Sequence, residues 1–370
     1  MTPNSQEALY YVALTLTKGI GAVIGRQILS FYGSPENFFK ESSKALSKLT
    51  WITSSILKNR TDPQLFSKAE KELSFAQKYQ IDLLFCDRKE YPFRLNECND
   101  APLMLYYKGC ADLNTFRVLS IVGTRRPTSY GLRMCEEMME TLRQKCPDVL
   151  VCSGLAYGID VATHKEALRN QLKTVGVLGH SLDIIYPDIH RNVAVEMVEQ
   201  GGLLSEYPSG TGPDRPNFVM RNRIIAGMAD ATVVVESSER GGSLITAAAA
   251  DSYNREIFAF PGRSIDPTSC GCNNLIRDCK ASLATSMDDI LKAMNWESTC
   301  KQPVQQDLFL TLSDEENNIV KVLYNQSEGL HINQIALQTG LPVYKLSSIL
   351  LEMEMKGLVK TLPGCLYRIG

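Results

Sequence analysis

The chain has 370 residues, more than one typical core needs, so we expect two or three domains. A formal net charge of −2 gives no overall attraction to a polyanion, and any polyanion site must be a local concentration of arginine and lysine. The sequence lacks a membrane span and a signal peptide, which predicts a cytoplasmic protein with no membrane partner. Eleven cysteines without a framework of spacings favour reduced thiols.

Residues 1–75 carry the apolar spacing of helices, interrupted once by Gly19-Ile20-Gly21. This predicts an N-terminal helical domain of the helix-hairpin-helix or SAM-like type. Its glycine turn either presents backbone N–H groups to a DNA phosphate or only lets two helices pack. A dinucleotide fingerprint is not supported, because a helical pattern rather than a strand precedes the glycines. Residues 76–105 are expected to be a connector.

Residues 106–295 alternate short β-branched runs with helical segments. This order predicts an α/β domain with an extended, Rossmann-like doubly wound sheet. Ligands of such sheets bind beyond the carboxyl ends of the strands. The six predicted strands are residues 117–122, 149–152, 174–178, 203–206, 231–236 and 257–260.

Glycine turns follow four of these strands and should meet at one edge of the sheet. A glycine turn that feeds a helix N-terminus leaves backbone N–H groups that can point at an anion. Arginines lie near two of the turns, and Arg221-Asn222-Arg223 adds two guanidinium groups that suit phosphate, unless either one forms a structural ion pair. The turns are Gly123-Thr124-Arg125-Arg126, Ser153-Gly154 with Gly158, Gly179-His180 and Gly241-Gly242-Ser243.

The residues at this edge favour binding over catalysis. They include no pair of carboxylates placed for acid–base work and no nucleophile beside a base, and no P-loop signature occurs. Cys270, Cys272 and Cys279 lack the paired spacing of a zinc site. We therefore expect no catalytic residue, no metal and no cofactor. One alternative stays open, a nucleotide-binding or nucleotide-hydrolysing Rossmann-like enzyme that uses Glu236, Glu239 or Asp160 as an acid.

Residues 296–312 are expected to be a linker and residues 313–370 a winged-helix domain. Ser313 and Glu316 form a capping-box start, two further helices follow, and residues 357–369 can form a two-stranded wing. The third helix carries two lysines and two glutamates, without the basic surface of a DNA-reading helix. Protein contact, regulation and DNA binding therefore remain open for this domain, as does a transcription regulator with a ligand-sensing core.

With these motifs in place, the chain resembles the DNA-processing protein A family, also called DprA or Smf. The resemblance implies an N-terminal helical domain, a Rossmann-like domain that binds single-stranded DNA, and a C-terminal winged helix. It also implies a homodimer that protects incoming DNA in natural transformation and helps load the RecA recombinase. The matching motifs are residues 121–125 (IVGTR), 153–160 (SGLAYGID), 205–208 (SEYP), 221–227 (RNRIIAG), 241–247 (GGSLITA) and 260–262 (FPG).

The resemblance also suggests roles for individual residues. Arg125 corresponds to the arginine of the family's GTR motif and would meet a phosphate. Arg215 and Phe218 look like the family's basic and aromatic pair, with Phe218 able to stack on a base, although the stretch around them departs from the usual proline-rich form. The predicted nucleic-acid-binding residues are Gly123, Thr124, Arg125, Arg126, Ser153, Gly154, Arg215, Phe218, Arg221, Asn222, Arg223, Gly241, Gly242 and Ser243.

Overall fold

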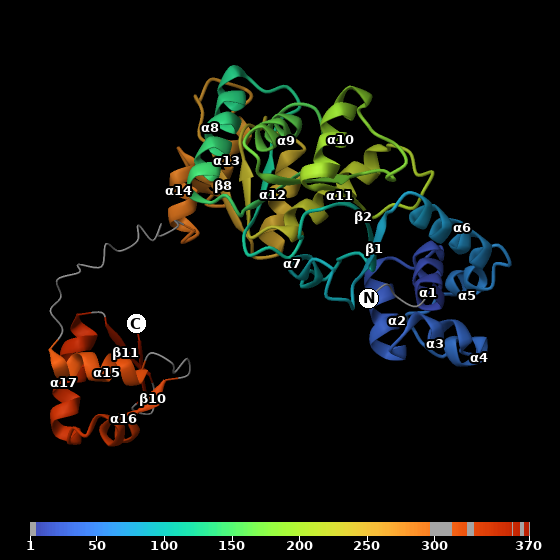
Figure 1. Cartoon of the computed structure of the whole chain (residues 1–370). Helices are drawn as coiled ribbons and strands as arrows, with labels where there is room; N and C mark the ends of the chain where they lie inside the picture. The colour runs from blue at the N-terminus through green and yellow to red at the C-terminus, as the bar shows by residue number, and fades with distance from the viewer. Residues whose placement is uncertain (1–4, 297–312, 324–328, 357, 363–365, 370) are drawn as a thin grey trace. The chain divides into compact units, whose positions relative to one another are not determined.

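The computed structural model describes residues 5–296, 313–323, 329–356, 358–362 and 366–369. The chain forms two compact units, Met1–Ser298 and Thr299–Gly370. The first unit holds the N-terminal helices and the large sheet, and the second is the C-terminal domain (Figure 1). No helix of the described residues is long and apolar enough to cross a membrane.

Six short helices build the N-terminal domain. Ser34, Ser42 and Thr53 cap three of them by accepting a hydrogen bond from a backbone N–H group. Asn59 donates to the Lys18 carbonyl (2.8 Å) in the turn between the first two helices, which supports a packing role for that turn. The helices are α1 (Ser5–Leu16), α2 (Ala22–Tyr32), α3 (Pro35–Lys40), α4 (Ser43–Leu46), α5 (Ser54–Arg60) and α6 (Leu65–Lys78).

A nine-stranded sheet forms the centre of the first unit, in the order β1-β2-β6-β5-β4-β3-β7-β8-β9. The pairs β1–β2 and β2–β6 are antiparallel, and all other neighbouring strands are parallel. The strands are β1 (Asp82–Phe85), β2 (Met104–Gly109), β3 (Val118–Val122), β4 (Leu150–Ser153), β5 (Lys173–Leu178), β6 (Gly202–Ser205), β7 (Ala231–Val234), β8 (Glu256–Ala259) and β9 (Ser282–Leu283).

Helices cover both faces of this sheet (Figure 1). On one face, α8 (Ser129–Lys145), α9 (Ile159–Arg169) and α14 (Met287–Ala293) bury apolar side chains against the sheet, with α10 (Arg191–Gln200) beside α9. On the other face, α11 (Arg215–Met228) and α12 (Ser243–Ser252) share a core with the N-terminal helices. The remaining helical segments are α7 (Phe93–Asn96), η1 (Asp188–His190) and α13 (Cys270–Arg277).

The six predicted strands are confirmed as β3 to β8, and the doubly wound α/β class with them. Three further strands, β1, β2 and β9, were not predicted. Strands β1 and β2 are antiparallel, and residues 86–103 between them hold only the four-residue helix α7, so the regular strand–helix alternation is missing there; β9 has only two residues. The sheet therefore begins at Asp82, inside the range that we expected to be a connector.

The strand order reverses between β3 and β7. From β3 the chain moves outward through β4, β5 and β6, and α11 then returns it to β7 on the other side of β3. In open parallel sheets, such a switch point leaves a crevice at the carboxyl ends of the two strands, because the loops that follow them turn in opposite directions. The loops after β3 and β7 are therefore the first place to look for a ligand.

The second unit is a winged helix. Ser313 and Glu316 form the expected capping box, with the Glu316 N–H group donating to the Ser313 hydroxyl (3.2 Å) and the Ser313 N–H group donating to the Glu316 carboxylate (2.8 Å). Its sheet has the order β10-β12-β11, one strand more than the predicted wing. The elements are α15 (Asp314–Leu323), β10 (Leu330–His331), α16 (Ile332–Thr339), α17 (Val343–Met355), β11 (Val359–Leu362) and β12 (Leu366–Ile369).

Gly201 lies just before β6, at the junction between the antiparallel and parallel parts of the sheet. A Cβ atom at this position would lie 1.9 Å from the Thr174 carbonyl oxygen, a backbone atom of β5 that cannot move aside. We expect Gly201→Ala to lower the free energy of unfolding by about 2 kcal/mol or more. Gly212→Ala is the control, since nothing lies within 4 Å of a Cβ atom there. Urea unfolding checks both, and equal midpoints would contradict this account of the junction.

Candidate nucleic-acid interface

The loop after β3 is held from two sides. The Thr124 N–H group donates to the Glu236 carbonyl after β7 (2.7 Å), and the Thr124 carbonyl accepts from the Ile159 N–H group at the start of α9 (3.1 Å). Gly158 has φ +82°, and a Cβ atom there would lie 2.2 Å from the Thr124 carbonyl oxygen. A side chain at residue 158 would therefore displace the backbone that carries Arg125.

Glu236, one of the candidate catalytic acids, serves as a clasp between the loops after β3 and β7. Its side chain is buried, and its two carboxylate oxygens accept from the Thr128 N–H group (2.8 Å) and the Thr128 hydroxyl (2.6 Å). Thr128 is the N-cap of α8. The carboxylate thus fixes the start of a helix, which favours a structural role for Glu236.

Arg221 is buried, which favours a structural role over the predicted ligand contact. Its guanidinium is buried, donates to the Gly154 carbonyl at 2.7 Å, and also donates to the Val177 carbonyl. It lies near the buried Asp160, whose charge partly compensates its own. Burial lowers the pKa of Arg221 to about 10, so the side chain stays charged at neutral pH. Arg221 is a support beneath the loops.

Arg223 forms an ion pair inside the protein, which is the alternative that the sequence left open beside a phosphate contact. Its Nη2 atom lies 2.7 and 2.6 Å from the two Glu206 carboxylate oxygens, and its Nη1 atom donates to the Asp100 carbonyl (2.5 Å). The Arg223 side chain is only 9% exposed. Burial raises the pKa of Glu206, while the Arg223 charge opposes that change.

The predicted hydroxyl donors are likewise used inside the protein. The Ser153 hydroxyl is buried and donates to the Ile121 carbonyl (2.6 Å), and the Ser243 hydroxyl donates to the Ser237 hydroxyl oxygen (2.9 Å). Asn222 donates to the Gly242 carbonyl (3.5 Å), which places the glycine turn against α11. These three side chains position the loops, so a ligand would meet backbone groups here rather than hydroxyls.

Three of the predicted arginines, Arg125, Arg126 and Arg215, are exposed. The Arg125 guanidinium carbon lies 6.0 Å from the centre of the Phe218 ring, within the range of a cation–π contact. The structure thus brings together Arg125, from the loop after β3, and Phe218, from the first turns of α11. Arg215 begins α11, one helical turn before Phe218.

Tyr186 joins this group, although no motif or pattern in the sequence marked it. Its ring stacks on Phe218 with 5.7 Å between ring centres and 28° between ring planes, and the residue is 45% exposed. Tyr186 lies in the loop after β5, where the sequence pattern marked only Gly179-His180. A long irregular loop shows no periodicity, so nothing in the sequence indicated which of its side chains turns back to the crevice.

The remaining candidates do not form a reactive cluster. Burial raises the pKa of Asp160, with the nearby Arg221 charge opposing it. The described residues contain no group of histidine, cysteine, aspartate and glutamate that is placed to hold a metal ion. Cys272 is buried and its thiol contacts the Val234 carbonyl, whereas Cys279 is exposed.

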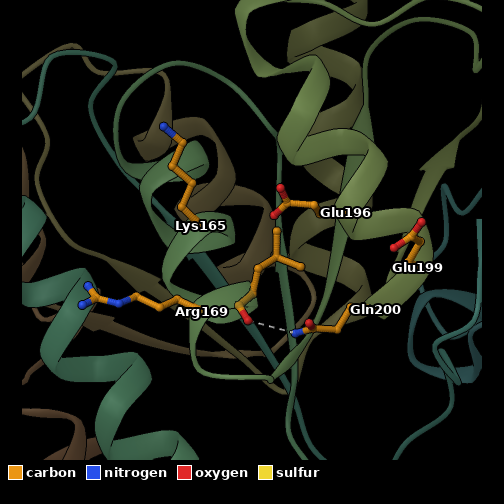
Figure 2. Close-up of a pocket in the computed structure, with 6 residues that line it drawn as sticks. Lys165, Arg169, Glu196, Glu199 and Gln200 are labelled. Atoms are coloured by element: carbon orange, nitrogen blue, oxygen red, sulfur yellow. Dashed lines mark hydrogen bonds between the residues drawn. The ribbon is translucent and has the colours of Figure 1, made fainter.

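A cavity between α9 and α10 lies away from these residues (Figure 2). It has a volume of about 560 Å³, and lysine, arginine and glutamate side chains of both helices line it together. Gln200 on its wall donates to the Leu172 carbonyl just before β5 (2.8 Å), which places that wall at the amino ends of the strands. Its mixed charge and its position give no reason to include it in the site.

A substitution at Arg221 separates a supporting role from a ligand-binding role. We expect Arg221→Ala to lower the free energy of unfolding by about 3 kcal/mol, because it leaves the buried Asp160 without its charge partner. Arg215→Ala, at an exposed arginine of the same helix, should change that free energy by less than about 0.5 kcal/mol. Urea unfolding at neutral pH measures both, and similar stability of the two variants would count against the supporting role.

Models of known protein families match both units of the chain. The model described as DNA recombination-mediator protein A matches residues 82–295, which span the large sheet. The model described as the DprA winged helix domain matches residues 306–365. The sheet and the C-terminal domain are thus recognised separately.

Relatives and solved structures agree with this assignment. Protein Smf from Synechocystis is 31% identical over 99% of both chains, and the DNA processing protein DprA from Streptococcus pneumoniae is 40% identical over 54% of this chain and 70% of its own. The crystal structure of the S. pneumoniae protein matches with a TM-score of 0.62 at 31% identity, over 77% of this chain and 97% of its own.

A second solved structure is that of DNA processing protein A from Helicobacter pylori, described for its single-stranded DNA binding mode. It matches with a TM-score of 0.53 at 27% identity, and covers 58% of this chain and 96% of its own. Since the family model for the sheet covers more than half of the chain, and a relative at 31% identity aligns along nearly its whole length, the chain belongs to the DNA-processing protein A (DprA/Smf) family.

Proposed function

We propose that this protein binds single-stranded DNA in the crevice between β3 and β7 and performs no bond chemistry there. The observation that carries the proposal is the exposed Arg125 guanidinium beside the Phe218 ring, at the carboxyl ends of the strands. A cation next to an aromatic ring suits a nucleotide strand, because the cation can meet a phosphate while the ring stacks on a base. The single-stranded DNA binding mode described for the H. pylori relative supports this reading.

The site should read the backbone more than the sequence. Arg125, Arg126 and Arg215 supply exposed positive charge around the crevice, although the net charge of the chain is −2. Phosphate contacts release counterions, so affinity should fall steeply with salt. Aromatic stacking accepts any base, because every base has a π face. Binding to oligonucleotides of different sequence should therefore be similar.

The state of the carboxylates supports a binding role over the alternative of a nucleotide-hydrolysing enzyme. Glu236 clasps Thr128, Glu206 pairs with Arg223, and Asp160 lies buried near Arg221. Each of these three acids is committed to an internal partner, which disfavours a role in proton transfer to a ligand. Glu239, the other candidate acid, is exposed, so the test below bears on it most directly. Incubation with nucleoside monophosphates tests the alternative, and release of a free base would favour the enzyme.

Family membership supports a wider role. We propose that the protein acts in natural transformation in the cytoplasm, where it protects incoming single strands, works as a homodimer and helps load the RecA recombinase. These partners follow from the family and not from any surface described above. A pull-down with purified RecA and a measurement of molar mass in solution test the two interactions.

The winged helix is proposed to be dispensable for single-strand binding. The outward face of α17 carries three exposed side chains, Tyr344, Leu351 and Met355. Leu351 follows Tyr344 by seven residues and Met355 follows Leu351 by four, so the three form one apolar stripe along the helix. The charged residues Lys345 and Lys356 are engaged with Glu315 and Glu316. A helix that reads DNA needs free basic and amide side chains on its outward face, and α17 offers few.

The central test is Arg125→Ala. Loss of one phosphate contact should weaken binding to oligonucleotides of any sequence by about tenfold, and should make the slope of log affinity against log salt shallower by about 0.7. Fluorescence anisotropy titrations at several salt concentrations measure both. Arg169→Ala is the control, because this arginine is 70% exposed on the far end of α9 and pairs with Glu136 and Glu166. Unchanged affinity and slope for Arg125→Ala would count decisively against the site.

Truncation tests the role of the winged helix. A chain that ends at Trp296 should keep its affinity for single strands within about twofold, because the core of the first unit is complete without the second. In competition between single- and double-stranded oligonucleotides at two salt concentrations, the full-length protein and the truncated protein should both prefer single strands. A large loss of single-strand affinity on truncation would place part of the DNA site on the winged helix.

A further inference from the structure

A second recess opens at the carboxyl edge of the sheet, on the side of β8. It has a volume of about 610 Å³, and residues that follow β3, β7 and β8 line it. The contact between Arg125 and Phe218 lies towards β5, because the backbone at Gly179 after β5 packs on the Phe218 ring. In the strand order β5-β4-β3-β7-β8, the recess therefore lies on the other side of β3 from the proposed DNA contacts.

Hydrogen bonds hold the walls of this recess in place. The Asn273 side chain accepts from the Gly262 N–H group (3.1 Å) and donates to the Gly262 carbonyl (3.0 Å), which ties the segment after β8 to α13. The Tyr130 hydroxyl donates to the Pro261 carbonyl (3.1 Å), which ties the same segment to α8. The recess is thus formed before any ligand arrives, so binding there costs little ordering of the protein.

Ser269 contributes an unused hydroxyl group to the recess. The residue immediately precedes α13 and is only 6% exposed, yet it lines the recess. Its hydroxyl does not cap the helix and has no hydrogen-bond partner among the residues that the structure describes. A Cβ atom at Gly262 would lie 2.0 Å from this hydroxyl oxygen, so glycine leaves room for it. A buried hydroxyl without a partner is costly, and a ligand in the recess would remove that cost.

The groups around Ser269 suit a phosphate. Arg263 lines the recess, is exposed and forms no ion pair within the described part of the chain. Arg133 adds a second guanidinium, which pairs only with Glu137 of its own helix (3.5 Å). The N-terminus of α13 favours negative charge at the same place. A phosphomonoester has three acceptor oxygens, which can meet a guanidinium, a hydroxyl and a helix N-terminus together.

The remaining walls suit the rest of a nucleotide. The volume of the recess is larger than a phosphate needs and is that of a small-molecule site. Tyr130 and Pro261 supply an apolar wall, and the Asp266 carboxylate can accept from a hydroxyl or amino group of the ligand. Glu236 also lines the recess, but both of its carboxylate oxygens already accept from Thr128.

We propose that this recess binds the phosphomonoester of a nucleotide, either free or at the end of a DNA strand. Ser269 and Arg263 hold the phosphate at the N-terminus of α13, and no bond is made or broken. This site goes beyond the proposed function, because it shares no contact with Arg125 or Phe218.

Calorimetric titration of the full-length chain with deoxyadenosine monophosphate tests the site. Arg263→Ala should weaken binding roughly tenfold, since it removes a charged hydrogen bond to the phosphate. Ser269→Ala should weaken binding roughly threefold or more. The melting temperature of Ser269→Ala should not fall, because the hydroxyl has no partner inside the protein. A hydroxyl with a purely structural role would instead lower that temperature and leave nucleotide affinity unchanged.

Arg277→Ala is the matched control for charge. Arg277 lies at the other end of α13, its side chain is 69% exposed, and it pairs with its neighbour Asp278. This variant should bind the mononucleotide like the unmodified chain. Arg125→Ala separates the two sites, since it should weaken single-strand binding and leave mononucleotide binding unchanged.

Oligonucleotides with and without a terminal phosphate identify the source of the ligand. If the terminal phosphate raises affinity for the unmodified chain and Arg263→Ala removes that gain, the recess holds a strand end. Mononucleotide binding that depends on Arg263 without such a gain assigns the recess to a free nucleotide. Absence of binding by both ligands, or unchanged binding in Arg263→Ala and Ser269→Ala, would overturn the recess as a site. Neither result would touch the proposed function, which the effect of Arg125→Ala on single-strand binding tests separately.

Discussion

The buried guanidinium of Arg221 joins the helices and strand ends that meet near the switch point of the sheet. Arg221 reaches from α11 to the Gly154 carbonyl after β4 and to the Val177 carbonyl near the end of β5, and it lies near Asp160 at the start of α9. One side chain thus joins a helix on one face of the sheet to the ends of two strands and to a helix on the other face. A charge in this position is costly to bury, and Asp160 with the two carbonyl groups offsets that cost.

The arginines near the switch point divide into a buried layer and an exposed layer. Arg221 and Arg223 form the buried layer, whereas Arg125 above them is exposed. Burial lowers the pKa of Arg221 most, and the positive charge of Arg125 lowers that pKa further. Asp160 opposes both effects, and Glu206 pairs with Arg223, so carboxylates compensate the charges of the buried layer. The attraction for an anion therefore depends on the exposed layer.

The sequence predicted the sheet better than the site. Strands β3 to β8 are short β-branched runs between helical segments, and this alternation is a strong local signal. The roles of the arginines depend on burial, which is not local. Arg221 and Arg223 stand in the same short motif as the partly exposed Asn222, and only the packing of α11 between the sheet and its neighbours decides that both arginines turn inward. Tyr186 could not be found for the same reason, since its contact with Phe218 joins two separate loops.

Two of the glycine turns need glycine for a different reason from the one that the sequence indicates. We expected glycines to let the backbone approach a phosphate. At Gly154, however, a Cβ atom would lie 2.6 Å from both the Arg221 guanidinium and the Asp160 carboxylate, and at Gly179 the same space holds the Phe218 ring. These two glycines make room for the protein's own side chains. Gly242, at the N-terminus of α12, has nothing within 4 Å of a Cβ position.

A glycine-rich turn is therefore a weak guide to which backbone meets the ligand, even where the turn belongs to the right edge of the sheet. Space that is already filled by Arg221 or Phe218 cannot also admit a phosphate. Open space beside the N-terminus of α12 is not a sufficient guide either, because the Leu244 and Ile245 N–H groups already donate to the Gly241 and Gly242 carbonyls (3.1 and 3.2 Å). The exposed Arg125 guanidinium beside the Phe218 ring is therefore the firmer guide to where a strand binds, since neither group is used to hold the loops together.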